Sequence, residues 1–414
     1  MSAEPRIQPS PLARRRGHPN GRPEPVGGKL LTGPYKILLA LAGAGFLLIV
    51  WRFAVGLGAS TALSDGYPWG LWIAFDVVTG TALACGGYAV AILVYILNKG
   101  RYHPLVRPAI LTSVLGYSIA GLSIVVDLGR PWHLWKVPLF FWEWNLNSAL
   151  LEVALCITAY VIVAFLEISP AFLERWRDSG PTKLQRLAER ALPFMDRALI
   201  WILALGLLLP TMHQSSLGTM MLLAGPRLHP LWNTPLVPLF FLINCLALGY
   251  AAVVLESTLS ARVFGRKPEI QMLSTIERIA AWTSLLFVAL RLGDVAVRGH
   301  FALLLRPDLY AALFWTEIVL LCLAPFAGLA GRPRSYNPGR LFRGAMLLAL
   351  GGALYRFDTY LVAFDPGPGW HYFPSVPETL ITVGLVAFEV ALYIAVVKRF
   401  PILAGLRPAS APAR

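Results

Sequence analysis

The feature that most constrains the fold of this chain is a series of ten long apolar runs. A helix needs about 20 mostly apolar residues to cross a bilayer core of about 30 Å, and in lipid each backbone polar group must be satisfied within its own segment. The qualifying runs are 35–58, 70–97, 106–128, 146–167, 198–223, 235–259, 273–297, 309–330, 342–363 and 378–398. The sequence therefore predicts an all-α, polytopic integral membrane protein of about ten transmembrane helices in two bundles.

Composition supports the same class. A chain of 414 residues would ordinarily form two or three soluble domains, but 57% of these residues are hydrophobic and 14% are charged. We expect a disordered basic arm over residues 1–34, a transmembrane domain over 35–400 and a cytoplasmic tail over 401–414. The Arg triplet in the arm is not read as an export signal, because the next apolar run is long enough to span and lacks an obvious cleavage site.

The net charge of +14 is distributed as in a membrane protein rather than a nucleic-acid-binding protein. With the N-terminus inside, 27 of the 36 Lys and Arg residues fall in inner segments and five in outer loops. This positive-inside bias predicts that both termini are cytoplasmic. We expect the lipid bilayer as a partner, in a bacterial cytoplasmic membrane, and no nucleic acid.

Cysteine and histidine usage limits the cofactors. The four cysteines fall inside apolar runs with no CxxC pair, so neither a disulfide framework nor an iron–sulfur cluster is expected in this chain. A b-type haem in a helix bundle normally takes two axial histidines, and His213 is the only histidine within a run. We expect no haem and no metal site, and any electron chemistry would involve a quinone dissolved in lipid.

Ionisable residues within the apolar runs gather toward the predicted outer side. An ionisable side chain in a membrane span is a functional hypothesis by default, with structural pairing as the alternative. The outer set is Arg52, Asp76, Asp127, Glu152, His213, Arg291, Asp294, Glu317, Arg356 and Asp358. Glu389 lies near the middle, and Glu277 is one of few such groups in the inner half. Any chemistry is therefore expected below the outer surface.

Pairing remains open for several of these charges. Arg291 and Asp294 are three residues apart on one helix, so they can pair with each other. Arg356 and Asp358 are two apart, so each is expected to pair with another helix. Charges that only hold the bundle together are the alternative to a site that binds a polar head group or passes protons. The aromatic stretch 130–145 is first of all an ordinary interfacial belt.

The stretch LLLPTMHQSSLG (207–218) places polar groups inside an apolar run. Pro210 removes a backbone donor and tends to kink a helix, so the stretch could be a kink with polar contacts between helices. A quinone pocket needs apolar walls, one or two donors and groups that exchange protons. His213 and Gln214, beside Asp76 or Glu152, have suitable chemistry for such a pocket.

Several long stretches resemble the NrfD/polysulfide-reductase family of membrane subunits. They are GYPWGLWIAFDVVTGTALACGG (66–87), NKGRYHPLVRPAILTSVLGYSIAGLSIVVDLGRPW (98–132), LLPTMHQSSLGTM (208–220) with HPLW (229–232), and LVAFDPGPGWHYFPS (361–375). The likeness covers nearly everything after the arm and looks strongest for the HybB branch, the membrane subunit of hydrogen-uptake nickel–iron hydrogenases.

The resemblance implies a haem-free helical subunit that exchanges electrons with a quinone near the outer face. Its partners there would be a ferredoxin-like iron–sulfur subunit and a catalytic subunit. The family pattern falls on Trp69, Asp76, Asp127, Arg130, His213, Gln214, Arg291 and Arg356, with His133 less secure. Relatives serving other oxidoreductases leave the catalytic partner open.

The resulting hypothesis is a quinone-reactive subunit of a periplasm-facing respiratory complex. His213, Asp76 and Asp127 are the candidate catalytic residues, and Trp69, Arg130, His133, Gln214 and Glu152 are candidates for quinone binding. Coupled proton translocation would use Arg291, Asp294, Glu317, Arg356, Asp358, Glu389 and Glu277. The competing class is a secondary transporter of a polar or anionic solute.

Overall fold

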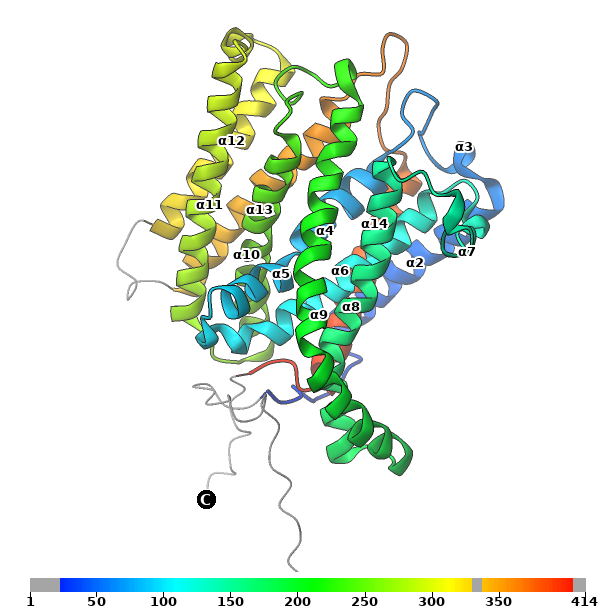
Figure 1. Cartoon of the computed structure of the whole chain (residues 1–414), viewed down its shortest axis with the longest axis vertical. Coiled ribbons are helices and arrows are strands. Elements are labelled where there is room, and N and C mark those ends of the chain that lie inside the picture. Colours follow the sequence, from blue (N-terminus) through cyan, green and yellow to red (C-terminus); the bar gives the residue numbers. More distant parts are fainter. Residues whose placement is uncertain (1–22, 330–336, 405–414) are drawn as a thin grey trace, which may run out of the picture.

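The computed structural model describes residues 23–329 and 337–404, and its regular structure there is helical (Figure 1). Within these residues, eight helical segments are long and apolar enough to cross a membrane: Gly33–Val55, Trp72–Ile96, Gly100–Asp127, Ala149–Ser179, Thr182–Leu223, Val237–Phe264, Ile270–Val297 and Val376–Arg399. A shorter apolar helix covers Leu309–Ala324. The chain is thus an all-helical, multi-pass membrane protein.

The longer helices follow the predicted runs in order. They are α2 (Gly33–Val55), α6 (Val106–Asp127), α8 (Ala149–Ser179), α9 (Thr182–Leu223), α10 (Val237–Phe264), α11 (Ile270–Val297), α12 (Leu309–Leu329), α13 (Pro338–Phe357) and α14 (Val376–Arg399). Short helical turns occupy the connections: α3 (Leu57–Ser60), η3 (Gly100–Leu105), η4 (Pro131–His133), α7 (Lys136–Leu139), η5 (Phe141–Glu143), η6 (Gly225–Arg227) and η7 (Phe301–Leu305).

The second predicted run, 70–97, is not one regular helix. It consists of a π-helical segment η1 (Trp72–Thr79), short α-helical pieces α4 (Gly80–Leu83) and α5 (Gly86–Ala91), and a second π segment η2 (Ile92–Ile96). The Thr79 hydroxyl donates to the Ala74 carbonyl five residues back, which fits the wider turn. Such π turns are frequent at functional sites because they redirect side chains. A third π segment, η9 (Asp358–Val362), follows α13.

The predicted inner connection between 167 and 198 is helical. α8 and α9 continue past the apolar runs to a turn at Gly180–Pro181, and Figure 1 shows this green hairpin projecting from the lower end of the molecule. Leu173, Ala188 and Met195 pack in the core of the hairpin. The apolar contacts between the two helices stabilise this part of the hairpin.

Two interfaces organise the bundle. α10 is largely buried and packs against α5, α9, α11 and α13. α2 crosses α14 so closely that a Cβ atom on Gly45 would lie 2.7 Å from the Cα atom of Gly384. Small residues permit such close helix crossings in membrane proteins.

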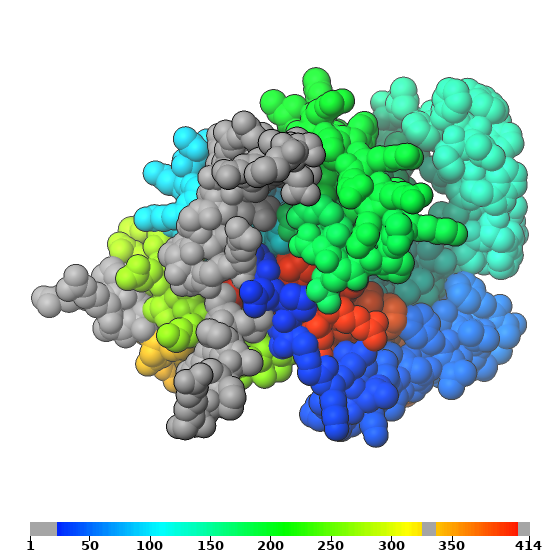
Figure 2. All heavy atoms as spheres, turned by 90° about the horizontal axis from the view of Figure 1, so that it is seen from below, coloured from blue at the N-terminus to red at the C-terminus, as the bar shows by residue number. Residues whose placement is uncertain are grey.

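The two ends of the described chain meet at the lower end of the molecule. The Glu24 amide donates to the Leu403 carbonyl at 3.1 Å, and the Val26 amide donates to the Val397 carbonyl at 3.0 Å. Figure 2 shows this blue segment against the red C-terminal segment, seen from below. Residues 1–22 of the predicted arm and 405–414 of the predicted tail lie outside the described residues.

Candidate functional site

His213 and Gln214 lie at the centre of a buried hydrogen-bonded cluster, which we call the α9 cluster (Thr81, Cys85, Tyr117, His213 and Gln214). His213 Nε2 is 3.3 Å from the Thr81 hydroxyl, and Gln214 Nε2 donates to Thr81 at 3.1 Å and to the Tyr117 hydroxyl at 3.3 Å. Tyr117 is also 3.4 Å from the sulfur of Cys85. Both His213 and Gln214 have 0% of their surface exposed, and α4, which is distant in the sequence, supplies their shared polar partner.

The backbone around the α9 cluster is held by close helix contact. α9 runs without interruption through Pro210, and a Cβ atom on Gly218 would lie 2.8 Å from the Val237 carbonyl at the start of α10. The Thr211 hydroxyl donates to the Leu207 carbonyl and contacts the Tyr88 hydroxyl at 2.8 Å. The stretch 207–218 therefore makes polar contacts between helices and also carries the imidazole of His213.

Arg356 is a fully buried cation that is satisfied by neutral acceptors. Its guanidinium donates to the Asn244 side chain at 2.6 Å, to the Val78 carbonyl at 2.9 Å and to the Phe241 carbonyl at 2.6 Å. It also lies 4.6 Å from the centre of the Phe241 ring. The prediction that Arg356 pairs with other helices is confirmed, and the acceptors lie on η1 and α10.

The expected pair between Arg291 and Asp294 does not form. Arg291 instead faces Glu317 on α12, with Nη2 3.6 Å from Oε2, and donates to the Leu231 carbonyl at 2.7 Å. Four aromatic rings surround its guanidinium, those of Trp232, Phe240, Phe314 and Tyr355. The three-residue spacing permitted the pair, but the side chain points into a neighbouring helix interface that periodicity does not reveal.

Asp294 has a different role at the end of α11. It forms an ion pair with Arg298 at 2.7 Å and accepts a 2.7 Å hydrogen bond from Thr234. Arg298 also donates to the carbonyls of Pro230 and Asn233. The pair thus fixes the segment before α10.

Asp358 and Glu317 meet beside Arg291. The two carboxyl groups influence each other electrostatically, and 1% of the Asp358 surface and 0% of the Glu317 surface are exposed. Trp232 Nε1 donates to Glu317 Oε1 at 3.0 Å, whereas both Asp358 oxygens lack a donor among the described residues. Arg291, Glu317 and Asp358 form what we call the carboxyl pair site.

Asp76 is buried where η1 packs against α14. Its Oδ2 atom accepts a 3.0 Å hydrogen bond from Thr382 on α14, and Glu389 on the same helix interacts with it electrostatically. At the end of α6, Asp127 lies beside the buried Arg52, whose guanidinium donates to the Leu128 carbonyl at 2.6 Å.

Trp69 is positioned through a residue that the sequence did not single out. Its Nε1 atom donates to the Tyr360 carbonyl at 2.9 Å, and the Tyr360 hydroxyl donates to the Leu217 carbonyl on α9 at 2.7 Å. Tyr360 therefore links Trp69 to the helix that carries His213.

Four predicted site residues do not belong to any of these clusters. Arg130 and His133 are exposed and Glu152 is half-buried, and within the described chain none of the three side chains makes a hydrogen bond or an ion pair. Glu277 is buried on α11, again without such a partner among the described residues.

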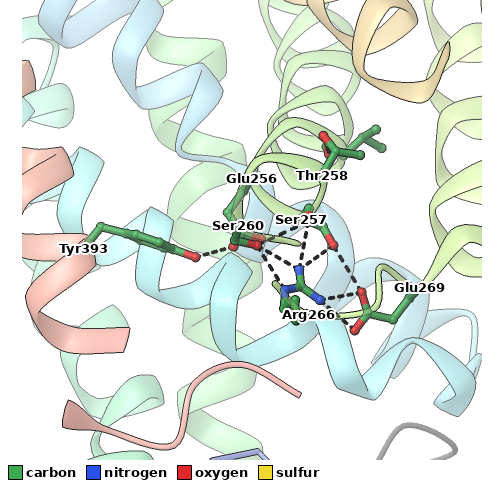
Figure 3. Close-up of polar contacts among 8 residues, drawn as sticks. Glu256, Ser257, Thr258, Ser260, Arg266, Glu269 and Tyr393 are labelled. Atoms are coloured by element: carbon green, nitrogen blue, oxygen red, sulfur yellow. Dashed lines mark hydrogen bonds and ion pairs between the residues drawn. The ribbon is translucent and has the colours of Figure 1, made fainter. Parts of the chain in front are cut away.

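A further buried network lies where α10 joins α11, and no sequence pattern predicted it. Figure 3 shows Arg266 reaching across the connection to Glu269, Ser257 and Ser260, with the two ion-pair distances at 2.8 and 2.9 Å. The Tyr393 hydroxyl of α14 donates to the neighbouring Glu256. A cavity of about 320 Å³ adjoins the network and is lined by Arg262, Leu259 and Phe342 among others.

His229 is a titratable group outside the spans whose pKa is shifted. Its ring stacks on Tyr310 with centres 4.1 Å apart, and its Nδ1 atom accepts a hydrogen bond from the Leu231 amide at 3.3 Å. Burial lowers the pKa of His229, with Arg306 and His300 acting in the same direction and Asp308 opposing them.

Sequence reasoning missed Thr81, Tyr117, Asn244, Trp232 and Tyr360. Each is a neutral polar residue, and such residues are common in membrane helices as interhelical contacts. No local pattern distinguishes the ones that contact a charged or catalytic group. Within the described residues, no group of three or more His, Cys, Asp or Glu side chains is arranged to hold a metal ion.

The fold and these buried clusters define a polytopic, all-helical membrane protein with ionisable groups inside its helix bundle. The family model "Polysulphide reductase, NrfD" matches residues 59–363, and the chain belongs to this family.

Curated relatives cover most of the chain. It is 42% identical over 396 residues to the "Probable Ni/Fe-hydrogenase 2 b-type cytochrome subunit" of Escherichia coli, covering 93% of this chain and 96% of the relative. It is 27% identical over 358 residues to the "Menaquinone reductase, integral membrane subunit" of Nitratidesulfovibrio vulgaris, covering 81% of this chain and 83% of the relative. Both alignments therefore extend over nearly the whole helical bundle.

Proposed function

We propose that this chain is the quinone-reactive membrane subunit of a respiratory oxidoreductase complex in a bacterial inner membrane. It exchanges electrons between an external iron–sulfur subunit and the membrane quinone pool. Membership of the NrfD family and the names of the hydrogenase and menaquinone reductase relatives support this class. The 42% identity to the hydrogenase 2 subunit favours an uptake nickel–iron hydrogenase as the catalytic partner.

The observation that carries the proposal is a pair of unused polar atoms in the α9 cluster. His213 Nδ1 and Gln214 Oε1 are buried and have no hydrogen-bond partner among the described residues. Buried polar atoms are rarely left in this state, and functional sites are among the exceptions. Each atom is thus available to a ligand in an apolar interior.

The hydrogen-bond pattern indicates what kind of ligand these atoms suit. The Thr81 hydroxyl donates its single proton to the Val77 carbonyl at 2.6 Å, so Thr81 accepts from both His213 Nε2 and Gln214 Nε2. Neutral His213 then carries its proton on Nε2, and Nδ1 is an acceptor. Two free acceptors match the two hydroxyl donors of a hydroquinone, and the imidazole is a base for one of its protons.

The remaining candidate residues take supporting roles in this proposal. Asp76 and Asp127 exchange protons, while Trp69, Arg130, His133 and Glu152 line the approach of the quinone or contact the partner. Because His213 is fully buried, the hydroquinone reaches it only when neighbouring side chains move apart.

The proposed topology has ten spans in two bundles with both termini cytoplasmic. Two further spans complete the ten beside the eight long segments. One is α12, and the other is α13 together with η9. The contact between Glu24 and Leu403 supports placing both ends on one side. The iron–sulfur subunit and the catalytic subunit then lie on the periplasmic side, opposite the termini.

The test compares His213→Ala and Asp76→Asn with Ser216→Ala in the purified complex. Ser216 is a buried residue of α9 whose hydroxyl donates to the Met212 carbonyl of its own helix, which makes it a matched control. We expect the first two variants to assemble and to lose quinone-linked turnover, while the control retains it. Normal assembly with wild-type turnover in both would show that the site assignment is wrong.

Proton translocation is a second candidate function, favoured by two further carboxyl groups, those of the buried Glu277 on α11 and of the half-buried Glu389 near the middle of α14. The complex in liposomes would show proton movement beyond that of quinone chemistry at one face. A stoichiometry explained by that chemistry alone would exclude pumping, and solute uptake by the isolated chain would favour a transporter instead.

A further inference from the structure

The carboxyl pair site concentrates buried polar atoms that make no hydrogen bond, although Arg291 Nη2 and Glu317 Oε2 form an ion pair at 3.6 Å. Arg291 Nε and Nη2, Glu317 Oε2 and both Asp358 oxygens are all buried without a hydrogen-bond partner among the described residues. The three residues come from α11, α12 and η9. α11 and α12 pack against each other and against α13, which continues directly into η9 (Figure 1). Five such atoms at one location call for a chemical explanation, because most buried polar atoms in proteins are paired.

Charge balance supplies that explanation. The guanidinium of Arg291 carries one positive charge, and two ionised carboxylates would leave the buried site with a net negative charge. A buried charge without compensation is strongly unfavourable, and two neighbouring carboxylates in a shared site resist simultaneous ionisation. One proton on the pair brings the site to neutrality and also supplies the donor that the facing oxygens lack.

The other charged groups near the site have partners elsewhere. Arg356, two residues before Asp358, directs its guanidinium to neutral acceptors on η1 and α10. The rings of Trp232, Phe314 and Tyr355 enclose Arg291, and Tyr355 contributes a hydroxyl that stays neutral at physiological pH. Further along α11, Asp294 and Arg298 form a separate ion pair that neutralises itself. Arg291, Glu317 and Asp358 are all buried, so the charge is balanced from within the site.

We propose that Glu317 and Asp358 share a single proton, with Arg291 as their counter-ion, and that during quinone turnover this proton passes to bulk water and is recovered from it. The site is distinct from the α9 cluster but mechanically connected to it. Tyr355 contacts Arg291 and is followed in α13 by Arg356, which donates to Val78 three residues before Thr81. The second half of the proposal rests on the proposed quinone function, whereas the shared proton does not.

Infrared difference spectroscopy of the complex in nanodiscs tests the shared proton. Exchange into deuterium oxide shifts the band of a protonated carboxyl group, so comparison of wild type with Glu317→Gln and with Asp358→Asn isolates the pair. Each single variant leaves one carboxylate facing Arg291 as an ordinary ion pair. We therefore expect either substitution alone to remove the full protonated-carboxyl band.

The alternatives give different spectra. If both carboxyl groups are ionised in the wild type, the variants remove no protonated-carboxyl band. If both are protonated, each variant retains half of the band. Either result overturns the shared proton. Trp232→Phe is a second probe that keeps both carboxyl groups. Loss of its hydrogen bond to Glu317 is expected to shift the band, and an unshifted band would contradict the assignment.

Turnover tests the second half of the proposal. Reduction of the complex in the presence of quinone is expected to change the band assigned to the pair in the wild type but not in His213→Ala. A constant band in a wild-type complex that turns over would overturn proton release from this site while leaving the quinone function intact. Absence of turnover in the wild type would instead contradict the proposed function.

Discussion

The Nε atom of Arg356 donates a 2.6 Å hydrogen bond to the side-chain oxygen of Asn244, and this contact joins α13 to α10 across a fully buried interface. A guanidinium without a carboxylate partner relies on such neutral acceptors to offset the loss of hydration. Carbonyl oxygens of Phe241 and Val78 supply the other two. Asn244 is the only one of the three acceptors that belongs to a side chain and is therefore open to mutation.

Asn244→Leu should destabilise the protein by about 2 kcal/mol, because it leaves a buried charged donor unpaired while preserving side-chain size. Thermal unfolding in detergent would measure the loss. Asn147→Leu, at an exposed position of the connection between α6 and α8, should change stability little. Equal melting temperatures for wild type and Asn244→Leu would show that Arg356 finds another acceptor.

Thr81→Val should lower quinone-linked turnover about fivefold, since it removes the acceptor that orients His213 and Gln214 and a net hydrogen bond is worth about 1 kcal/mol. Thr81→Ser retains the hydroxyl and should restore most of the activity. Steady-state turnover of the purified complex gives the comparison.

Thr112→Val is the control for Thr81, because the Thr112 hydroxyl donates to the Pro108 carbonyl of its own helix. If Thr81→Val and Thr112→Val lowered turnover equally, the effect would be one of helix packing rather than of orientation at the site.

Much of the fold follows from the sequence, for a physical reason. Apolar runs are required by lipid, so the run 198–223 ends where α9 ends, at Leu223. Hydropathy marks membrane rather than helix, however, and it did not predict that α9 begins at Thr182 outside the run. The π segments within 72–79 and 358–362 depend on tertiary contacts and leave no mark in hydropathy.

For the candidate site as well, the sequence predicted some features and not others. Ionisable residues such as Arg291 and Glu317 stand out in an apolar run, and the sequence identified both. Their mutual pairing is a contact between α11 and α12, and the local spacing favoured Asp294 instead. Thr81 could not be chosen from the sequence, because its importance comes from the position of α4 against α9 rather than from its residue type.

Acidification should destabilise the connection between α9 and α10 through His229. Because burial holds the pKa of His229 below the ordinary value of 6.5, the unfolded chain binds a proton more readily than the folded chain. Stability is therefore fully present above about pH 6.5 and declines as the pH falls from there toward the lowered pKa. Melting temperatures at about pH 7.5 and about pH 5.5 would show the decline, and His229→Phe, which keeps an aromatic ring against Tyr310, should reduce it. An unchanged pH dependence in that variant would assign the decline to other groups.

Gly45→Ala should destabilise the contact between α2 and α14, because the new Cβ atom would lie 2.7 Å from the Cα atom of Gly384 and backbone cannot yield as a flexible side chain does. Overpacking of this kind costs about 1–3 kcal/mol. Gly43→Ala is a matched control two residues away in α2, where a Cβ atom meets nothing within 4 Å. There the substitution should be neutral or stabilising by up to about 1 kcal/mol, since alanine favours helix over glycine. Thermal unfolding of both variants decides the point: a loss of stability in Gly43→Ala equal to that in Gly45→Ala would place its origin in the helix backbone and not in the crossing with α14.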